Sequence, residues 1–127
     1  MRLVLDAGAL VALERDDPAM WRRLKSVLTS GGPPPLTHGG VVAQVWRGGS
    51  GRQARLARAL QGIETAPLDL GLARRSGVLL ARSGMRDAVD AAVVALAADG
   101  DRIVTSDPDD IAALVTSAGR RVDIVLA

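Results

Sequence analysis

Aspartates stand at separate places in the sequence where an apolar segment ends or begins. Asp6 follows the run "LVL", Asp107 follows "IVTS", and Asp90 opens the otherwise apolar stretch "DAAVVALA". Side chains at the carboxyl ends of neighbouring parallel strands meet at one edge of a sheet, where open α/β folds bind their ligands. Because an unpaired buried carboxylate is costly, the pattern predicts that these aspartates share a bound cation.

Magnesium or manganese is the expected cation, because hard cations prefer oxygen ligands. Asp87 stands three residues before Asp90, on the same face of a predicted helix, and adds a further carboxylate. An acidic edge with a divalent cation can polarise a phosphodiester, so the predicted reaction class is metal-dependent phosphodiester hydrolysis. Two of these residues also have a structural explanation, since Asp87 and Asp107 are both placed to cap a helix, whereas Asp6 and Asp90 are harder to explain in this way.

Composition excludes most other chemistries for this chain of 127 residues, whose length is that of one domain. There is no cysteine, which excludes disulfides and thiolate catalysis. His38 is the only histidine and is expected in a turn, and Lys25, the only lysine, lacks the glycines of a phosphate-binding loop. If the protein is an enzyme, carboxylates are expected to do its chemistry.

Charge is segregated along the chain. Residues 41–86 contain eight arginines against one glutamate and one aspartate, whereas residues 87–127 contain eight aspartates against three arginines. This asymmetry is consistent with a basic surface for nucleic acid beside an acidic site that holds cations. The alternative is that solvated charged faces simply cluster.

Strands and helices alternate in the sequence. Short apolar runs predict strands at 2–5 and 101–105, a third at 119–127, and weaker candidates at 33–38 and 63–68. Apolar residues recur at helical spacing in the other segments, at 19–30, 39–47, 52–61, 70–82, 87–98 and 109–118. The order predicts an α/β fold with a mainly parallel central sheet and helices on both faces.

Two further expectations concern the tryptophans and the location of the protein. Trp21 and Trp46 lie on apolar helical faces and are expected in the core rather than as platforms for stacked bases. No apolar run approaches the ~20 residues that span a bilayer, and the start is unlike a signal peptide. A cytoplasmic location without membrane association is therefore expected.

Three motifs in this order, "LVLDAGALVAL", "DAAVVALA" and "IVTSDPDD", resemble those of the PIN-domain family, and specifically VapC-like toxins of bacterial toxin–antitoxin systems. The resemblance runs over essentially the whole chain. It implies a single PIN-like domain over residues 1–127, with a three-layer α/β/α fold and a sheet of four to five strands.

The resemblance also implies a function, that of a ribonuclease dependent on Mg²⁺ or Mn²⁺. Asp6, Asp90 and Asp107 match the metal-binding aspartates that carry catalysis, and Asp87 and Asp110 are supporting metal ligands. Thr105 matches a hydroxyl residue that supports the last aspartate by hydrogen bonding. The implied partners are an RNA substrate, a VapB-like antitoxin that neutralises the enzyme, and a second copy in a homodimer.

Gln44 departs from the family pattern, because "VVAQVWR" carries an amide where a glutamate is usual. The cluster thereby loses one negative charge, and its metal affinity should fall, although Asp87 can replace that charge. The alternative function is therefore a catalytically silent PIN-like module that binds RNA or a protein. A phosphatase or receiver-like domain is disfavoured, because Gly8 replaces the second aspartate of the former and the lysine of the latter is missing.

A group of arginines in the basic half is the expected RNA-binding surface, because the guanidinium group pairs well with phosphate. Its members are Arg47, Arg52, Arg55 and Arg58. The alternative is that they form an exposed helix face that arginine keeps solvated.

Overall fold

The computed structural model describes residues 1–49 and 51–127 and contains a five-stranded sheet. The strands are β1 (Leu3–Leu5), β2 (Leu36–His38), β3 (Glu64–Ala66), β4 (Arg102–Thr105) and β5 (Asp123–Leu126). The helices are α1 (Ala7–Glu14), α2 (Pro18–Thr29), α3 (Gly39–Val45), α4 (Ala54–Leu60), α5 (Leu70–Ser83), α6 (Ala88–Leu96) and α7 (Pro108–Ala118). All pairings are parallel, in the order β3-β2-β1-β4-β5.

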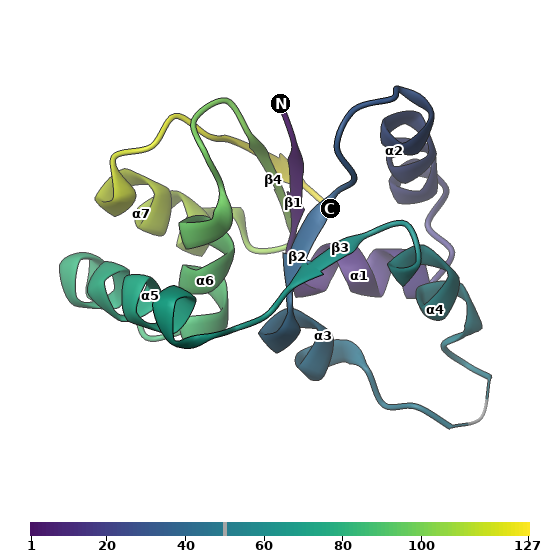
Figure 1. Ribbon diagram of the computed structural model, residues 1–127, viewed down its shortest axis with the longest axis horizontal. Helices are drawn as coiled ribbons and strands as arrows, with labels where there is room; N and C mark the ends of the chain where they lie inside the picture. The colour runs from purple at the N-terminus through teal and green to yellow at the C-terminus, as the bar shows by residue number, and fades with distance from the viewer. Residues whose placement is uncertain (50) are drawn as a thin grey trace.

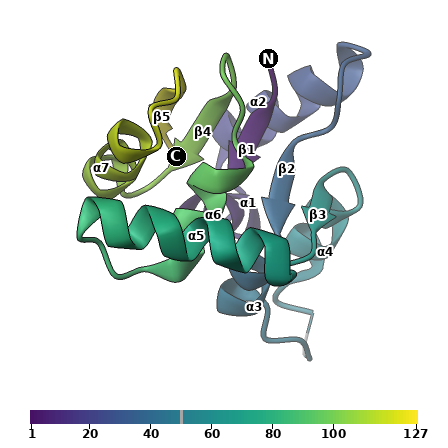
Figure 2. The ribbon, with the colours of Figure 1, turned by 60° about the vertical axis from the view of Figure 1, so that its left-hand side comes forward.

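The sheet lies between two layers of helices. Helices α5, α6 and α7 cover one face and helices α1, α2 and α4 lie on the other, with α3 below the carboxyl ends of the strands (Figure 1). When the molecule is turned, helix α5 passes in front of α6, and α7 lies above its left-hand end (Figure 2). The predicted three-layer α/β/α arrangement with a parallel sheet is therefore confirmed.

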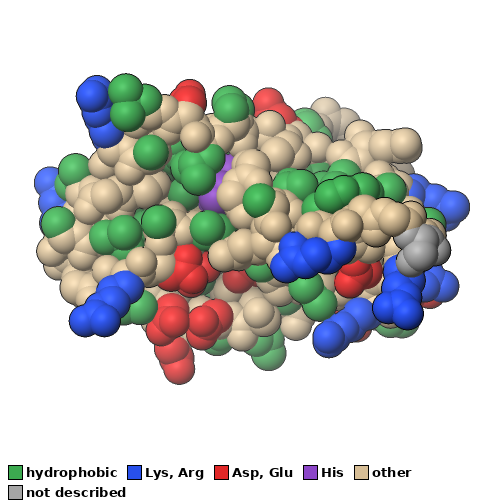
Figure 3. All heavy atoms as spheres, turned by 90° about the horizontal axis from the view of Figure 1, so that it is seen from below, with side chains coloured by type: hydrophobic (Ala, Val, Ile, Leu, Met, Phe, Trp, Pro, Cys, Tyr) green, Lys and Arg blue, Asp and Glu red, His purple; other side chains and the backbone are tan. Residues whose placement is uncertain are grey.

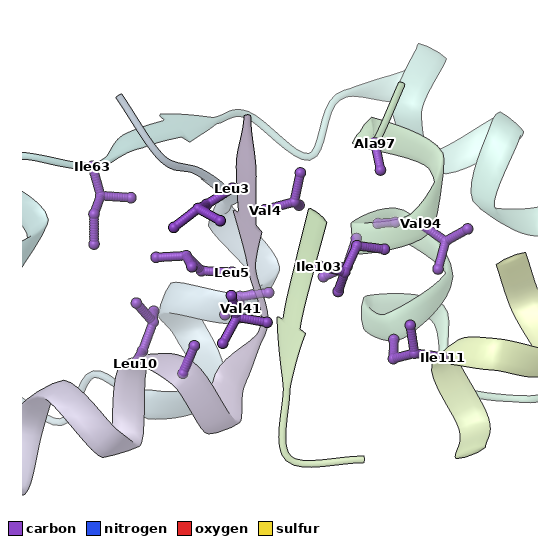
Figure 4. Packing of buried hydrophobic residues seen from close by; sticks show 14 of the residues in the cluster. Leu3, Val4, Leu5, Leu10, Val41, Ile63, Val94, Ala97, Ile103 and Ile111 are labelled. Atoms are coloured by element: carbon purple, nitrogen blue, oxygen red, sulfur yellow. The ribbon is translucent and has the colours of Figure 1, made fainter. Parts of the chain in front are cut away.

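The core lies on both faces of β1 and β4. Leu3 and Leu5 point toward the α1 side, whereas Val4 points with Ile103 toward α6 (Figure 4). Val4 and Ile103 are partners in the parallel register and are wholly buried. Because both faces are covered, these strands are continuous apolar runs without polar alternation.

Helix α1 was not among the predicted helices. Its sequence, "AGALVALE", is apolar around almost the whole helix, so it shows no period of 3.6 residues from which a helix could be predicted. Asp6 caps its amino end, and Ala9, Leu10 and Leu13 are buried against the sheet. The helix thus begins directly where β1 ends, which fixes Asp6 at the carboxyl edge.

The structure corrects the expectation for one tryptophan and qualifies it for the other. Helix α3 ends at Val45, so Trp46 lies beyond the helix with 41% of its surface exposed and is not in the core. Trp21 is half-buried on α2. Among the described helices, none combines the length and apolar character needed to cross a membrane.

Candidate metal centre at the carboxyl edge

Asp6 sits at the junction of β1 and α1, where it is held from two sides. Its amide donates to the carbonyl of Val104 at 3.2 Å, which continues the pairing with β4. Its Oδ1 accepts a hydrogen bond from the amide of Ala9 at 3.1 Å, which caps α1. Only 4% of the residue is exposed, so the side chain is fixed beneath the edge.

Thr105 joins Asp6 to the end of β4. Its hydroxyl donates to Oδ2 of Asp6 and accepts from the amide of Asp107 at 2.9 Å. Because Thr105 is wholly buried, the contact is shielded from water. Thr105 therefore makes hydrogen bonds of the kind that the resemblance implied, one to the side chain of Asp6 and one to the backbone of Asp107.

Asp107 occupies the cap position of α7, but within the described chain its side chain makes no capping hydrogen bond. Pro108 follows at the first helical position. The exposed carboxylate instead lies with those of Asp90 and Asp110, and one oxygen of each falls within 4.8 Å of the other two. Three carboxylates from two helices therefore converge at one point, and we call Asp90, Asp107 and Asp110 the acidic cluster.

Asp87 has a structural role at the start of α6. Its Oδ1 accepts from the amides of Val89 at 2.9 Å and Asp90 at 3.1 Å. The capping interpretation therefore holds for Asp87, which is not a member of the acidic cluster. Its negative charge still acts on Asp90 from one turn away.

Charge repulsion and burial both act on the protonation of these residues. Desolvation raises the pKa of Asp90 to about 6, with further contributions from the charges of Asp87, Asp6, Asp107 and Asp110. Burial raises the pKa of Asp6, although hydrogen bonds from Thr105 and nearby amides oppose the shift. Partial desolvation and the charge of Asp110 raise the pKa of Asp107. The charges that act on Asp90 and Asp107 are those of other carboxylates, so the acidic cluster would be stabilised by a bound cation.

The donor set fits a hard divalent cation. Magnesium takes oxygen ligands at about 2.0–2.1 Å in octahedral geometry, so opposite ligand atoms are ~4 Å apart. The oxygens of Asp90, Asp107 and Asp110 lie close to this range. Asp6 lies beside the acidic cluster, where its charge raises the pKa of Asp90 and Asp107, but it is not one of the three residues whose oxygens converge.

His38 was expected in a turn, but it lies at the end of a strand. It ends β2, is wholly buried, and accepts a hydrogen bond at Nδ1 from the amide of Gly40 at 3.0 Å. Its Nε2 lies 3.0 Å from the carbonyl of Val89 and donates to it, because Nδ1 is already an acceptor. Burial lowers the pKa of His38, which favours this neutral form. His38 therefore links the start of α3 to the first turn of α6, the turn that also contains Asp90.

Gln44 and the four arginines expected to bind RNA lie in different environments. Gln44 is exposed on α3. Arg47 folds back onto the carbonyls of Ala43 and Trp46, and Arg52 is exposed in the turn before α4. The remaining two members, Arg55 and Arg58, border a hollow between α2 and α4.

Acidic and basic side chains are separated on the face that carries the carboxyl edge. In the view from below, one group of acidic side chains forms a patch that reaches the lower edge of the molecule, and the Lys and Arg side chains lie outside it, most of them toward the margins (Figure 3). Such an arrangement attracts a cation to the acidic patch and a polyanion to the basic side chains around it.

Comparison with known proteins identifies the fold. No model of a known protein family matches this sequence, and no curated protein matches it. A solved structure that is similar is the crystal structure of VapBC2 from Rickettsia felis bound to a DNA fragment from its promoter. The likeness covers 98% of this chain and 98% of that chain, with a TM-score of 0.70 and 13% sequence identity. The three-layer fold of this protein is therefore PIN-like.

Proposed function

We propose that this protein is a VapC-like endoribonuclease that hydrolyses RNA phosphodiester bonds with Mg²⁺ or Mn²⁺. One observation carries the proposal: carboxylate oxygens of Asp90, Asp107 and Asp110, from two helices, approach within 4.8 Å of one another at the carboxyl edge. The likeness of the fold to the VapBC2 structure supports it.

The acidic residues have different roles, which depend on where each one lies. The acidic cluster holds the cation, and Asp87 adds negative charge from the adjacent helix cap. Bound there, a divalent cation supplies Lewis-acid chemistry toward a phosphodiester. Burial and the neighbouring carboxylates raise the pKa of Asp90 to about 6 in the metal-free protein, and a cation held by the acidic cluster would favour its charged form. Asp6, tied to β4 through Thr105, contributes charge beneath this point and fixes the edge.

Cleavage of RNA with and without metal tests the proposal. Wild-type protein should cut RNA in Mn²⁺ or Mg²⁺ and stop when EDTA is added. Asp90→Ala and Asp107→Ala should each lower the rate by about 100-fold or more, because losing a cation ligand should cost at least as much as the ~10–100-fold lost with an outer-shell partner. Asp123→Ala is the matched control, because Asp123 is an exposed aspartate on β5, outside the cluster.

The outcome against the proposal is equally concrete. Cleavage that survives EDTA, or that survives both cluster substitutions, would come from another site or from a contaminating nuclease. Asp6→Ala, measured beside them, shows whether the buried aspartate takes part in catalysis or only in folding.

We also propose that a VapB-like antitoxin neutralises the enzyme and that the protein acts as a homodimer. The VapBC2 structure is of such a complex with promoter DNA, which supports the first of these proposals. Co-expression with the product of a short neighbouring reading frame should abolish RNA cleavage. Light scattering after gel filtration should give twice the mass of one chain.

Gln44 favours a second candidate, a catalytically silent PIN-like module that binds RNA or a protein partner. Its exposed amide on α3 cannot neutralise a cation. Calorimetric titration with Mn²⁺ separates the two functions, because a silent module should show no metal binding that depends on the acidic cluster. Gln44→Glu should raise metal affinity if the nuclease is the correct assignment.

A further inference from the structure

A hollow between α2 and α4 combines an aromatic ring with several cations. It has a volume of about 410 Å³. Its polar and aromatic lining consists of Asp16, Trp21, Arg22, Lys25, Arg55 and Arg58. The wall therefore combines an aromatic side chain with four cations and one carboxylate, and proteins bind single-stranded nucleic acid with a basic groove and aromatic side chains.

Trp21 is held in a fixed position in this wall. Its indole Nε1 donates to the carbonyl of Leu13 at 3.0 Å, so the only polar group of the ring is already satisfied by α1. The ring is half-buried and packs partly against the core. What it offers to the hollow is therefore apolar aromatic surface at little cost in side-chain entropy.

Most of the cations of the hollow are not neutralised. Arg55 forms an exposed ion pair with Asp16 at 3.6 Å. In residues 1–49 and 51–127 no ion pair joins Arg22, Lys25 or Arg58 to a carboxylate. These three charges are available to an anionic ligand.

A second hollow leads from this wall along α1 toward the residues next to the acidic edge. It has a volume of about 680 Å³, follows α1 past Val11, and shares Asp16 and Pro18 with the first hollow. Its other end is lined by Ala7, Gly8 and Ser106, of which Ala7 follows directly on Asp6 and Ser106 directly on Thr105. Since α1 has eight residues and is ~12 Å long, the path from the edge to Trp21 has the length of about two to three nucleotides.

We propose that the single-stranded RNA beside the cleavage point runs from the acidic edge along α1 and stacks a base on Trp21. Arg22, Lys25 and Arg58 contact its phosphates. The proposal rests on the function proposed above and adds the path of the substrate to it. Stacking on an aromatic side chain is tolerant of sequence, so this path binds an unpaired strand without reading its bases.

Fluorescence and affinity in EDTA test the stacked base without cleavage. The probe is a single-stranded octaribonucleotide of alternating A and C. Trp46→Phe leaves Trp21 as the only tryptophan, and its emission should be quenched as the probe saturates the protein. Trp21→Ala should weaken binding about 10-fold, whereas Trp21→Phe should retain most of the affinity. Trp46→Ala is the matched control and should bind as the wild type does.

Salt dependence tests the phosphate contacts on variants that remove only exposed charges. Arg22→Ala and Arg58→Ala should each reduce the slope of log affinity against log salt by about 0.7. Arg82→Ala, an exposed arginine on α5, should leave the slope unchanged. Asp16→Asn should raise affinity about two-fold, because it frees Arg55; asparagine tolerates the left-handed backbone of Asp16, where φ is 62°.

The outcomes separate this inference from the proposed function. Unchanged affinity in Trp21→Ala, unquenched emission in Trp46→Phe, or binding of a partner protein but no RNA at this hollow would overturn the RNA path. If the wild type binds the probe with these signatures but cleaves no RNA in Mn²⁺, the path stands and the nuclease assignment fails. If it cleaves RNA while Trp21→Ala and Arg58→Ala bind normally, only the path fails.

Discussion

At the scale of single residues, Thr105 carries more of the site than its size suggests. A hydroxyl has one proton, so donating to Asp6 leaves its oxygen free to accept from the amide of Asp107. One side chain thus fixes a buried carboxylate and the backbone that presents an exposed one. The two aspartates repel each other, since the charge of Asp6 contributes to the raised pKa of Asp107.

Replacing Thr105 by valine should destabilise the protein and misplace Asp107. The shapes are similar, so the main change is a buried carboxylate oxygen of Asp6 without its donor, which costs about 1–3 kcal/mol. We expect this loss in the free energy of unfolding measured in urea, with weaker Mn²⁺ binding. Thr105→Ser keeps the hydroxyl and should recover most of both; equal losses in the two variants would mean that packing, not the hydrogen bond, is responsible.

Asp90 should make the metal-free protein less stable as pH rises. Its folded pKa of about 6 lies above the ordinary aspartate value of 3.8, so between these values the folded state binds more protons than the unfolded state. Stability is therefore lost as pH rises from about 4 through 6. Asp90→Asn should remove this loss and gain about 1 kcal/mol at pH 7, allowing for solvent screening.

The measurement is the free energy of unfolding in EDTA between pH 4 and pH 8, for Asp90→Asn and wild type together. The difference between the two curves removes the opposite contribution of buried His38, whose lowered pKa makes stability fall as pH drops below about 6.5. Asp123→Asn should run parallel to the wild type. A difference that does not change with pH would show that Asp90 is not under strain from its neighbours.

At the scale of elements, the site depends on how closely α1 packs against the turn between β4 and α7. Gly8 lies in the first turn of α1, and a Cβ atom there would come 2.9 Å from the backbone nitrogen of Ser106. That turn carries Asp107. The close approach explains why α1 has no side chain at the position two residues after Asp6.

Gly8→Ala should destabilise the protein, although alanine is the better helix former by about 1 kcal/mol. The added methyl must push the β4–α7 turn away, and overpacking of this kind costs about 1–3 kcal/mol. Gly77→Ala in α5 is the matched control, because a Cβ there meets nothing within 4 Å. Thermal unfolding should show a lower melting temperature for the first variant and a higher one for the second.

Periodicity and capping signals account for most of the elements but not for how they pack. The strands could be predicted because apolar runs end at Asp6 and just before Asp107. Helix α1 could not, because an apolar residue on every face leaves no period to detect. Asp110 was assigned only through the family resemblance, and only the structure shows that α6 and α7 bring it beside Asp90.

The remaining differences between expectation and structure depend on which elements pack over a residue, and a sequence pattern does not contain that information. Trp46 has apolar neighbours in the sequence, yet α3 ends before it and 41% of its surface stays exposed. Trp21 was expected in the core, but the hollow between α2 and α4 leaves part of it at the surface. No local sequence pattern could predict the hydrogen bond of His38, because its partner Val89 lies 51 residues away.

At the scale of the whole molecule, folding itself assembles the acidic cluster, so metal binding and stability are linked. The unfolded chain separates Asp90 from Asp107 and Asp110, whereas the folded chain holds their oxygens within 4.8 Å. A cation that binds only the folded state stabilises it by RT ln(1 + [L]/Kd), about 2.7 kcal/mol at a hundred times Kd.

Asp107→Asn should therefore have opposite effects on thermal stability with and without metal. In EDTA the variant should melt at or above the wild-type temperature, because one repelling charge is gone. In Mn²⁺ at a hundred times the wild-type Kd, the wild type should gain about 8 °C, at ~3 °C per kcal/mol for a chain of this size, and the variant much less. Asp123→Asn should follow the wild type in both conditions. Equal gains for Asp107→Asn and wild type would place the Mn²⁺ elsewhere and remove the acidic cluster as the metal centre, because no other property of this substitution reverses its sign with the cation.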